Sequence, residues 1–239
     1  MPALRLAHIC EKRRKAEIIM ILTDLLDVKN KNTRMIAKVC GVEKIIVRLP
    51  ESENFNPDSF EQMRALYKDI VLDGLTPIGI EPMPPRWHEH VKRGDEKRDE
   101  CIEKIIAMLG VLDKLNMRLI CFNFMPYIGW LRTSTKLAER GGATVTGFSL
   151  RDFIPTDDKI TAQKLWENYE YFIKAILPYA EKYGIKLALH PDDPPLDLGG
   201  VERIMVSYSN IQRALNICSS DFLGVTFCQA TYKMMGEDI

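Results

Sequence analysis

The chain has 239 residues, of which 46% are apolar and 28% are charged, as in ordinary globular proteins. Its 33 basic and 33 acidic residues give a formal net charge of zero, so the overall charge favours neither nucleic acid nor an anionic membrane as a partner. No apolar run reaches the roughly 18 to 20 residues needed to span a bilayer, and residues 1–15 lack a signal-peptide core. We therefore expect a cytoplasmic protein.

Two domain-level features are predicted. Residues 1–15, with the basic run at Glu11–Lys15, are expected to form a solvated N-terminal extension, and residues 16–239 a single α/β domain. The cysteines are scattered and form no CxxC pair, so in a reducing compartment they are expected to be free thiols. They are Cys10, Cys40, Cys101, Cys121, Cys218 and Cys228.

Strand-like and helix-like segments alternate along the chain. In order, they are a strand at Glu17–Asp24, a helix at about Asn32–Val39, a strand at Lys44–Pro50, a helix from Ser59 to Gly74, a strand at Leu75–Pro82, a helix bearing Ile102, Ile105, Ile106, Leu109 and Leu112, a strand at Met117–Phe124, a helix from about Thr161 to Tyr183, a strand at Ile185–His190, a helix at Tyr208–Cys218 and a strand at Phe222–Cys228. The charged stretch before Ile102 and the segment from Phe124 to about Thr161 are expected to be loops.

Apolar strands alternating with helices predict a parallel sheet buried on both faces. No glycine-rich phosphate fingerprint follows the first strand, which argues against an open dinucleotide-binding sheet. A TIM (β/α)₈-type barrel is favoured, because such barrels collect their sites from all strand ends. Polar residues end nearly every predicted strand: Asp24, Arg48, Glu81, Asn123, His190 and Cys228. A barrel of this type has about 250 residues and eight strands, so we expect about six of its βα units here, with the C-terminal strands absent.

Two strand-end residues suggest a metal site. His190 and Cys228 end neighbouring predicted strands, and imidazole with thiolate suits a first-row transition metal. Three or more protein ligands are usual. On spacing alone, a hydrogen-bonded histidine and a buried thiol are the favoured interpretation.

The sequence around His190 and Cys228 favours the metal site over the structural interpretation. Three blocks resemble the mannonate dehydratase family: ICFNFMPYIGWLRT (Ile120–Thr133), LALHPDDPP (Leu187–Pro195) and GVTFCQATY (Gly224–Tyr232). The stretch RWHEHVKRGDEKRDE (Arg86–Glu100) resembles it more weakly, and the similarity extends from about Gly41 to Ile239.

The resemblance implies a TIM barrel of the xylose-isomerase-like group that dehydrates D-mannonate to 2-keto-3-deoxygluconate with a divalent metal, usually Mn²⁺. It places His190 and Cys228 among the metal ligands. The remaining ligands and the catalytic groups are expected beyond residue 239. Because thiolate is a soft ligand, Fe²⁺, Co²⁺ or Zn²⁺ would also suit the site.

Candidate substrate-binding residues follow from the same blocks. Asn123 can bind a sugar hydroxyl, Arg132 can grip a carboxylate, and Trp130 offers an apolar wall. A strand-end cap, a surface arginine and a core tryptophan are the structural alternatives. His88 and Glu89, expected in the loop after the third strand, match a family His-Glu pair and could line the substrate mouth.

The aspartates that follow His190 are candidate supporting residues. Asp192 or Asp193 is expected to orient the metal-binding imidazole, with a turn or capping role as the alternative.

Two other functions stay open. A related sugar isomerase or epimerase would share the metal but keep the C3 hydroxyl, and a truncated remnant would bind sugar acid without turning it over. The partner is expected to be a small sugar acid, and homo-oligomer formation is left open.

Overall fold

The computed structural model describes residues 20–236. Its main sheet has six parallel strands, and their spatial order follows the order of the chain. The strands are β1 (Thr23–Asp27), β2 (Lys44–Arg48), β3 (Thr76–Ile80), β4 (Leu119–Phe122), β8 (Lys186–Leu189) and β10 (Leu223–Val225). The parallel α/β architecture predicted from the sequence is therefore confirmed.

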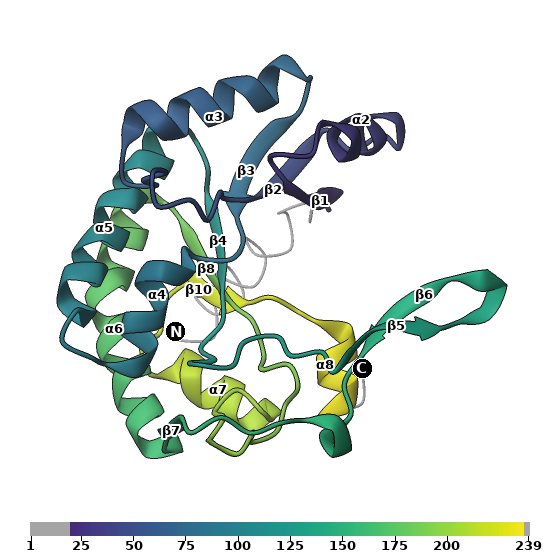
Figure 1. Cartoon of the computed structure of the whole chain (residues 1–239). Coiled ribbons are helices and arrows are strands. Elements are labelled where there is room, and N and C mark those ends of the chain that lie inside the picture. Colours follow the sequence, from purple (N-terminus) through teal and green to yellow (C-terminus); the bar gives the residue numbers. More distant parts are fainter. Residues whose placement is uncertain (1–19, 237–239) are drawn as a thin grey trace, which may run out of the picture.

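Helices follow these strands along the chain and pack outside the sheet (Figure 1). They are α2 (Lys31–Val39), α3 (Phe60–Leu72), α4 (Pro85–Arg93), α5 (Arg98–Lys114), α6 (Ala162–Tyr183), α7 (Tyr208–Asn216) and α8 (Gln229–Met234). The periodic apolar residues are buried as expected, for example Ile105 in α5 and Phe172 in α6. Among the described residues, no helix is both long and apolar enough to cross a membrane.

One strand differs from the sequence predictions near the N-terminus. The predicted basic extension at residues 1–15 lies outside the described residues, as does part of the strand predicted at Glu17–Asp24. The observed β1 lies later, so Asp24 pairs with Ile45 inside the strand and does not end it. Met20 and Leu22 are exposed, and therefore they lack the packing that would hold them in the sheet.

Helix α4 is a second difference, because its residues were expected to form a loop. Pro85 occupies the first turn and Gly94 adopts a left-handed conformation with φ of 67° at the C-terminal end. Trp87 and Val91 bury the inner face, and the helix packs against α5 and α6. The charged outer face obscured this amphipathic pattern in the sequence.

The expected loop between β4 and α6 also carries structure. An antiparallel hairpin of β5 (Ser134–Ala138) and β6 (Thr144–Gly147) projects away from the sheet (Figure 1). Short 3₁₀ turns occur at Arg140–Gly142 and Leu150–Asp152, and β7 (Lys159–Ile160) pairs with β9 (Gly200–Val201).

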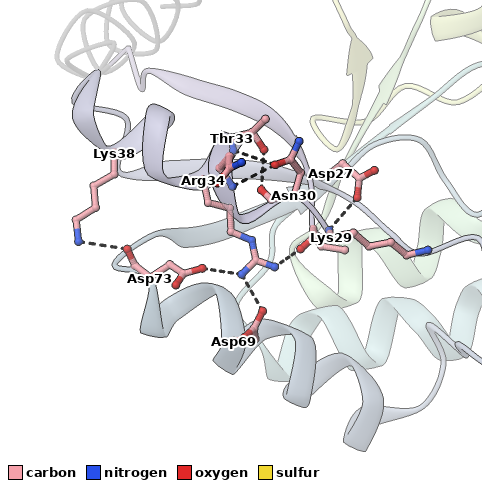
Figure 2. Close-up of polar contacts among 10 residues, drawn as sticks. Asp27, Lys29, Asn30, Thr33, Arg34, Lys38, Asp69 and Asp73 are labelled. Carbon is pink, nitrogen blue, oxygen red and sulfur yellow. Dashed lines mark hydrogen bonds and ion pairs between the residues drawn. The ribbon is translucent and has the colours of Figure 1, made fainter.

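Helix α2 is attached to α3 by a buried arginine (Figure 2). Asn30 caps α2, and its side chain accepts bonds from the backbone of Asn32 and Thr33. Arg34, 2% exposed, donates to Asp69 and Asp73 at 2.8 Å each, and also to the Val28 carbonyl.

Candidate functional site

Polar residues converge at one edge of the sheet because parallel strands end there together. Val47 pairs with Ile80, Phe122 with Leu189, and Leu189 with Val225. The residues that end or follow these strands therefore lie along the carboxyl edge, where α/β enzymes bind their substrates. They are Arg48, Glu81, Asn123, His190 and Cys228.

His190 is buried and held in one orientation. Its Nδ1 lies 2.8 Å from the Pro191 carbonyl oxygen, and its ring packs edge-on against Trp130 with centroids 5.3 Å apart. A carbonyl only accepts hydrogen bonds, so Nδ1 is the donor, and in the neutral imidazole the lone pair is then on Nε2. The imidazole is thus prepared to bind a metal or a proton donor through Nε2.

Cys228 lies just beyond the adjacent strand. The Thr226 nitrogen donates to the Leu189 carbonyl at 2.8 Å, which keeps the two strands paired beyond β10. The Cys228 Sγ accepts a bond from Thr231 Oγ1 at 3.1 Å and is partly buried. Imidazole and thiol therefore belong to the ends of adjacent strands.

These two side chains fit part of a metal-binding set. A free imidazole lone pair and a sulfur donor suit a first-row transition ion. Within residues 20–236, no group of three or more His, Cys, Asp or Glu side chains is arranged to hold a metal. A metal site at this edge of the sheet would therefore need ligands in addition to these two side chains.

The aspartates after His190 make contacts other than those expected. Asp192 is fully buried and its Oδ2 accepts bonds from the Ile204 and Met205 nitrogens, at 3.2 and 2.9 Å. Burial raises the pKa of Asp192. The bond that orients His190 comes from the Pro191 carbonyl, because the imidazole turns back onto the next residue of its own chain.

Asp193 instead pairs with Arg132. The two guanidinium nitrogens lie 3.1 and 2.8 Å from the two carboxylate oxygens. This bidentate bond to Asp193 raises the pKa of Arg132. Arg132 therefore does bind a carboxylate, but in this structure the carboxylate is the side chain of Asp193.

A pocket of about 260 Å³ opens at the same edge of the sheet; Trp130, whose ring contacts His190, lines it, whereas His190, Cys228, Arg132 and Asp193 are not among its lining residues. It lies at the carboxyl ends of β2, β3 and β4 and is closed on one side by α4. The lining residues are Arg48, Glu51, Pro82, Met83, Pro85, His88, Glu89, Lys92, Asn123, Met125, Gly129 and Trp130. The predicted residues His88, Glu89, Asn123 and Trp130 are thus brought together in one pocket.

His88 is buried in helix α4, whereas it was expected in a loop. Its ring is 2% exposed and lies between Phe122, Phe124 and Phe172, with centroids 5.2 to 5.9 Å away. Burial, followed by the charge of Lys92, places the pKa of His88 well below its ordinary value. The imidazole is therefore neutral, and among the described residues its Nε2 has no hydrogen-bond partner.

Sequence reasoning missed Lys92, which lies one turn after His88 on the same helix face. Its Nζ is 2.9 Å from Glu89 Oε2 and donates to the Met125 carbonyl at 2.9 Å. Burial lowers the pKa of Lys92, while Glu89 opposes that shift. The four-residue spacing from His88 would have revealed this lysine had α4 been predicted as a helix.

Glu89 and Asn123 also help to shape the pocket. Glu89 Oε1 accepts a bond from the Tyr127 nitrogen at 2.5 Å, and Asn123 Oδ1 accepts one from the Met125 nitrogen at 3.2 Å. Both side chains therefore fix the loop that follows β4, which carries Trp130.

The chain matches known proteins over most of its length. The family model of D-mannonate dehydratase (UxuA) matches residues 28–159 and 149–239. The mannonate dehydratase of Streptococcus uberis is 29% identical over 228 residues, covering 84% of this chain and 64% of that relative. The mannonate dehydratase of Brachyspira hyodysenteriae is 30% identical over 230 residues, covering 82% of this chain and 64% of the relative.

Solved structures agree with these matches. The crystal structure of mannonate dehydratase from Streptococcus suis serotype 2 superposes with a TM-score of 0.80 at 29% identity, covering 90% of this chain and 66% of that one. D-psicose 3-epimerase from Clostridium cellulolyticum H10 has a TM-score of 0.54 at 15% identity, which shows a shared barrel fold alone. The chain spans about two thirds or less of the relatives it matches. The family match, which covers nearly every residue from 28 onward, shows that the chain belongs to the D-mannonate dehydratase family.

Proposed function

We propose that the protein is a metal-dependent sugar-acid dehydratase that converts D-mannonate to 2-keto-3-deoxygluconate and water. The observation that carries this proposal is the family match over residues 28–239. The convergence of His190, Cys228 and the pocket at one sheet edge supports it.

His190 and Cys228 are proposed as two of the metal ligands. The Pro191 carbonyl fixes the imidazole so that Nε2 is available, and Thr231 orients the thiol. A bound divalent ion would stabilise the negative charge that develops when the C2 proton is removed. We propose Mn²⁺ as the metal, although the thiolate would equally suit Fe²⁺, Co²⁺ or Zn²⁺.

The pocket is proposed to hold the sugar acid. The Asn123 amide would bind a hydroxyl, and Trp130, whose ring contacts His190, would cover the carbon chain. Glu89 and neutral His88 would line the mouth. In the reaction, the C2–H bond and the C3–OH bond break, and the proton and hydroxide leave as water.

A cytoplasmic location is part of the proposal. Five cysteines of the described chain are free thiols: Cys40, Cys101, Cys121, Cys218 and Cys228. Free thiols, partly or fully buried in four of these cases, are consistent with a reducing compartment.

The test is turnover by the purified full-length protein. D-Mannonate should lose one water per molecule in a Mn²⁺-dependent manner, with 2-keto-3-deoxygluconate identified by mass spectrometry and NMR. The C2 epimer D-gluconate serves as the control substrate. A product that keeps its C3 hydroxyl would indicate an epimerase or isomerase, and no turnover with any divalent metal would contradict a catalytic role.

A further inference from the structure

A sugar acid brings a negative charge into the pocket, so a cation must receive it. Lys92 and Arg48 are the cationic side chains that line the pocket, and Arg132 lies two residues after Trp130, which also lines it. Arg132 pairs with Asp193 through both terminal nitrogens and also donates to the Leu131 carbonyl at 2.8 Å. Both terminal nitrogens of its guanidinium group therefore already have acceptors within the protein.

Lys92 is also committed to partners within the protein. Its ammonium group, on a side chain that is 7% exposed, pairs with Glu89 at 2.9 Å and donates to the Met125 carbonyl. The negative charge of Glu89 balances the positive charge of Lys92, so the two side chains together bring no net charge to this wall of the pocket. Asn168, which donates to the Lys92 carbonyl at 2.9 Å, fixes the backbone at the same point.

Arg48 differs from both. It is the last residue of β2, its side chain is exposed, and it lines the pocket. Within the described chain, no hydrogen bond or ion pair engages its guanidinium, and Glu51, which lines the same pocket, is not paired with it. The guanidinium group of Arg48 is thus a cation in this pocket that has no partner among the described residues.

We propose that Arg48 binds the carboxylate of the sugar acid and selects for acids over neutral sugars. The planar guanidinium offers two parallel N–H donors that match the two carboxylate oxygens, which a lysine ammonium cannot reproduce. This inference rests on the proposed function, since it names the residue that recognises the acid group in the same pocket.

The test compares variants of the full-length protein. Arg48→Gln should raise the KM for D-mannonate on the order of 10- to 100-fold, because one charge-assisted bidentate contact is lost. Metal content and melting temperature should stay unchanged, since Arg48 is exposed and has no partner whose loss would destabilise the fold. Arg48→Lys should give an intermediate KM. Arg64→Gln, which changes an exposed arginine of α3, is the matched control and should behave as wild type.

A binding measurement separates this inference from the dehydratase proposal. Calorimetry should show that the wild type prefers D-mannonate over its neutral amide, D-mannonamide, and that Arg48→Gln abolishes this preference. Binding without turnover in the wild type would contradict the dehydratase proposal while leaving Arg48 testable. An unchanged preference in Arg48→Gln overturns the inference. Loss of preference in Arg132→Gln alone would move the carboxylate contact to Arg132.

Discussion

A single backbone acceptor decides the chemistry that His190 can perform. The Pro191 carbonyl fixes the proton on Nδ1, so the lone pair stays on Nε2 at the sheet edge. His88 shows the opposite situation, since burial among three phenylalanines keeps it neutral without any such bond. Two histidines of one chain thus differ in role because their surroundings differ.

Metal retention should depend on Cys228 in the full-length protein. Cys228→Ser should lower the metal content at least about tenfold, because removing a ligand costs more than the roughly 10- to 100-fold loss typical of outer contacts. Cys218→Ser is the matched control, since Cys218 follows α7 and packs on the hydrophobic core. Elemental analysis of both variants checks this expectation, and equal metal retention would remove Cys228 from the site.

The sequence predicted which residues gather at the pocket better than it predicted their contacts. His88, Glu89, Asn123 and Trp130 were placed there from the motifs and do line it. The pairing of Arg132 with Asp193 could not be foreseen, because the two are 61 positions apart and meet only through the fold. Hydrogen bonds of this kind depend on side-chain conformations that no spacing rule encodes.

At the scale of elements, helices that bury a long apolar face were predictable from the sequence, whereas helix α4 was not. Helices α5 and α6 follow an apolar period that their burial confirms. Helix α4 was missed because five of its nine residues carry Arg, His or Lys side chains on a short segment, although Pro85 and Gly94 mark its ends. The hairpin β5–β6 was missed because it has no buried face to impose a pattern.

Docking of α2 onto α3 should depend on Arg34. Arg34→Met should lower the free energy of unfolding by about 1 to 3 kcal/mol, because two carboxylates and a carbonyl lose their donor. Lys38→Met is the control, since Lys38 reaches the Asp73 carbonyl from an exposed position and should cost no more than about 0.5 kcal/mol. Urea denaturation measures both values.

The same contact should make stability depend on pH. The bond to Arg34 lowers the pKa of Asp69 below its ordinary value of 3.8, so its contribution is complete above that value and is lost as the pH falls through the folded-state pKa. The stability difference between wild type and Arg34→Met should therefore stay constant from neutral pH down to the ordinary pKa of 3.8 and narrow as the pH falls below it. A difference that also stays constant below that pH would assign the effect to packing.

The end of α4 should be sensitive to a single added methyl group. In Gly94→Ala the new Cβ would lie 2.4 Å from Asn168 Oδ1, at a residue whose φ is already in the left-handed region. Gly184→Ala has a similar φ but open space around the Cβ, so it isolates the backbone cost of about 1 to 2 kcal/mol. Gly94→Ala should lower the melting temperature further, and equal shifts would show that Asn168 moves aside freely.

At the scale of the whole molecule, β1 and β10 are the outer strands of the described sheet, each paired on one side. Apolar side chains of the neighbouring helix α2 are exposed as well, namely Met35, Ile36 and Val39. Unpaired strand edges are known templates for association between chains. Leaving a few hundred Å² of apolar surface exposed also removes on the order of 10 kcal/mol of hydrophobic stabilisation, at about 25 cal/mol per Å².

Residues 1–239 expressed alone should therefore self-associate or melt with weak cooperativity, and should not turn over D-mannonate. Light scattering across a concentration series, thermal unfolding and a turnover assay measure these three properties, with the full-length protein as the control. A monomer that unfolds cooperatively and dehydrates D-mannonate would contradict the expectation.

The order of the strands has a consequence for how the chain is made. Each of the five strands after β1 lies beside the strand that comes before it in the chain, from β2 to β10. During synthesis, which proceeds from the N-terminus, each strand after β1 thus finds one of its neighbours already present when it leaves the ribosome. The growing chain can therefore add strands one at a time. If translation paused, the newest strand and β1 would be the two unpaired edges of the sheet made so far.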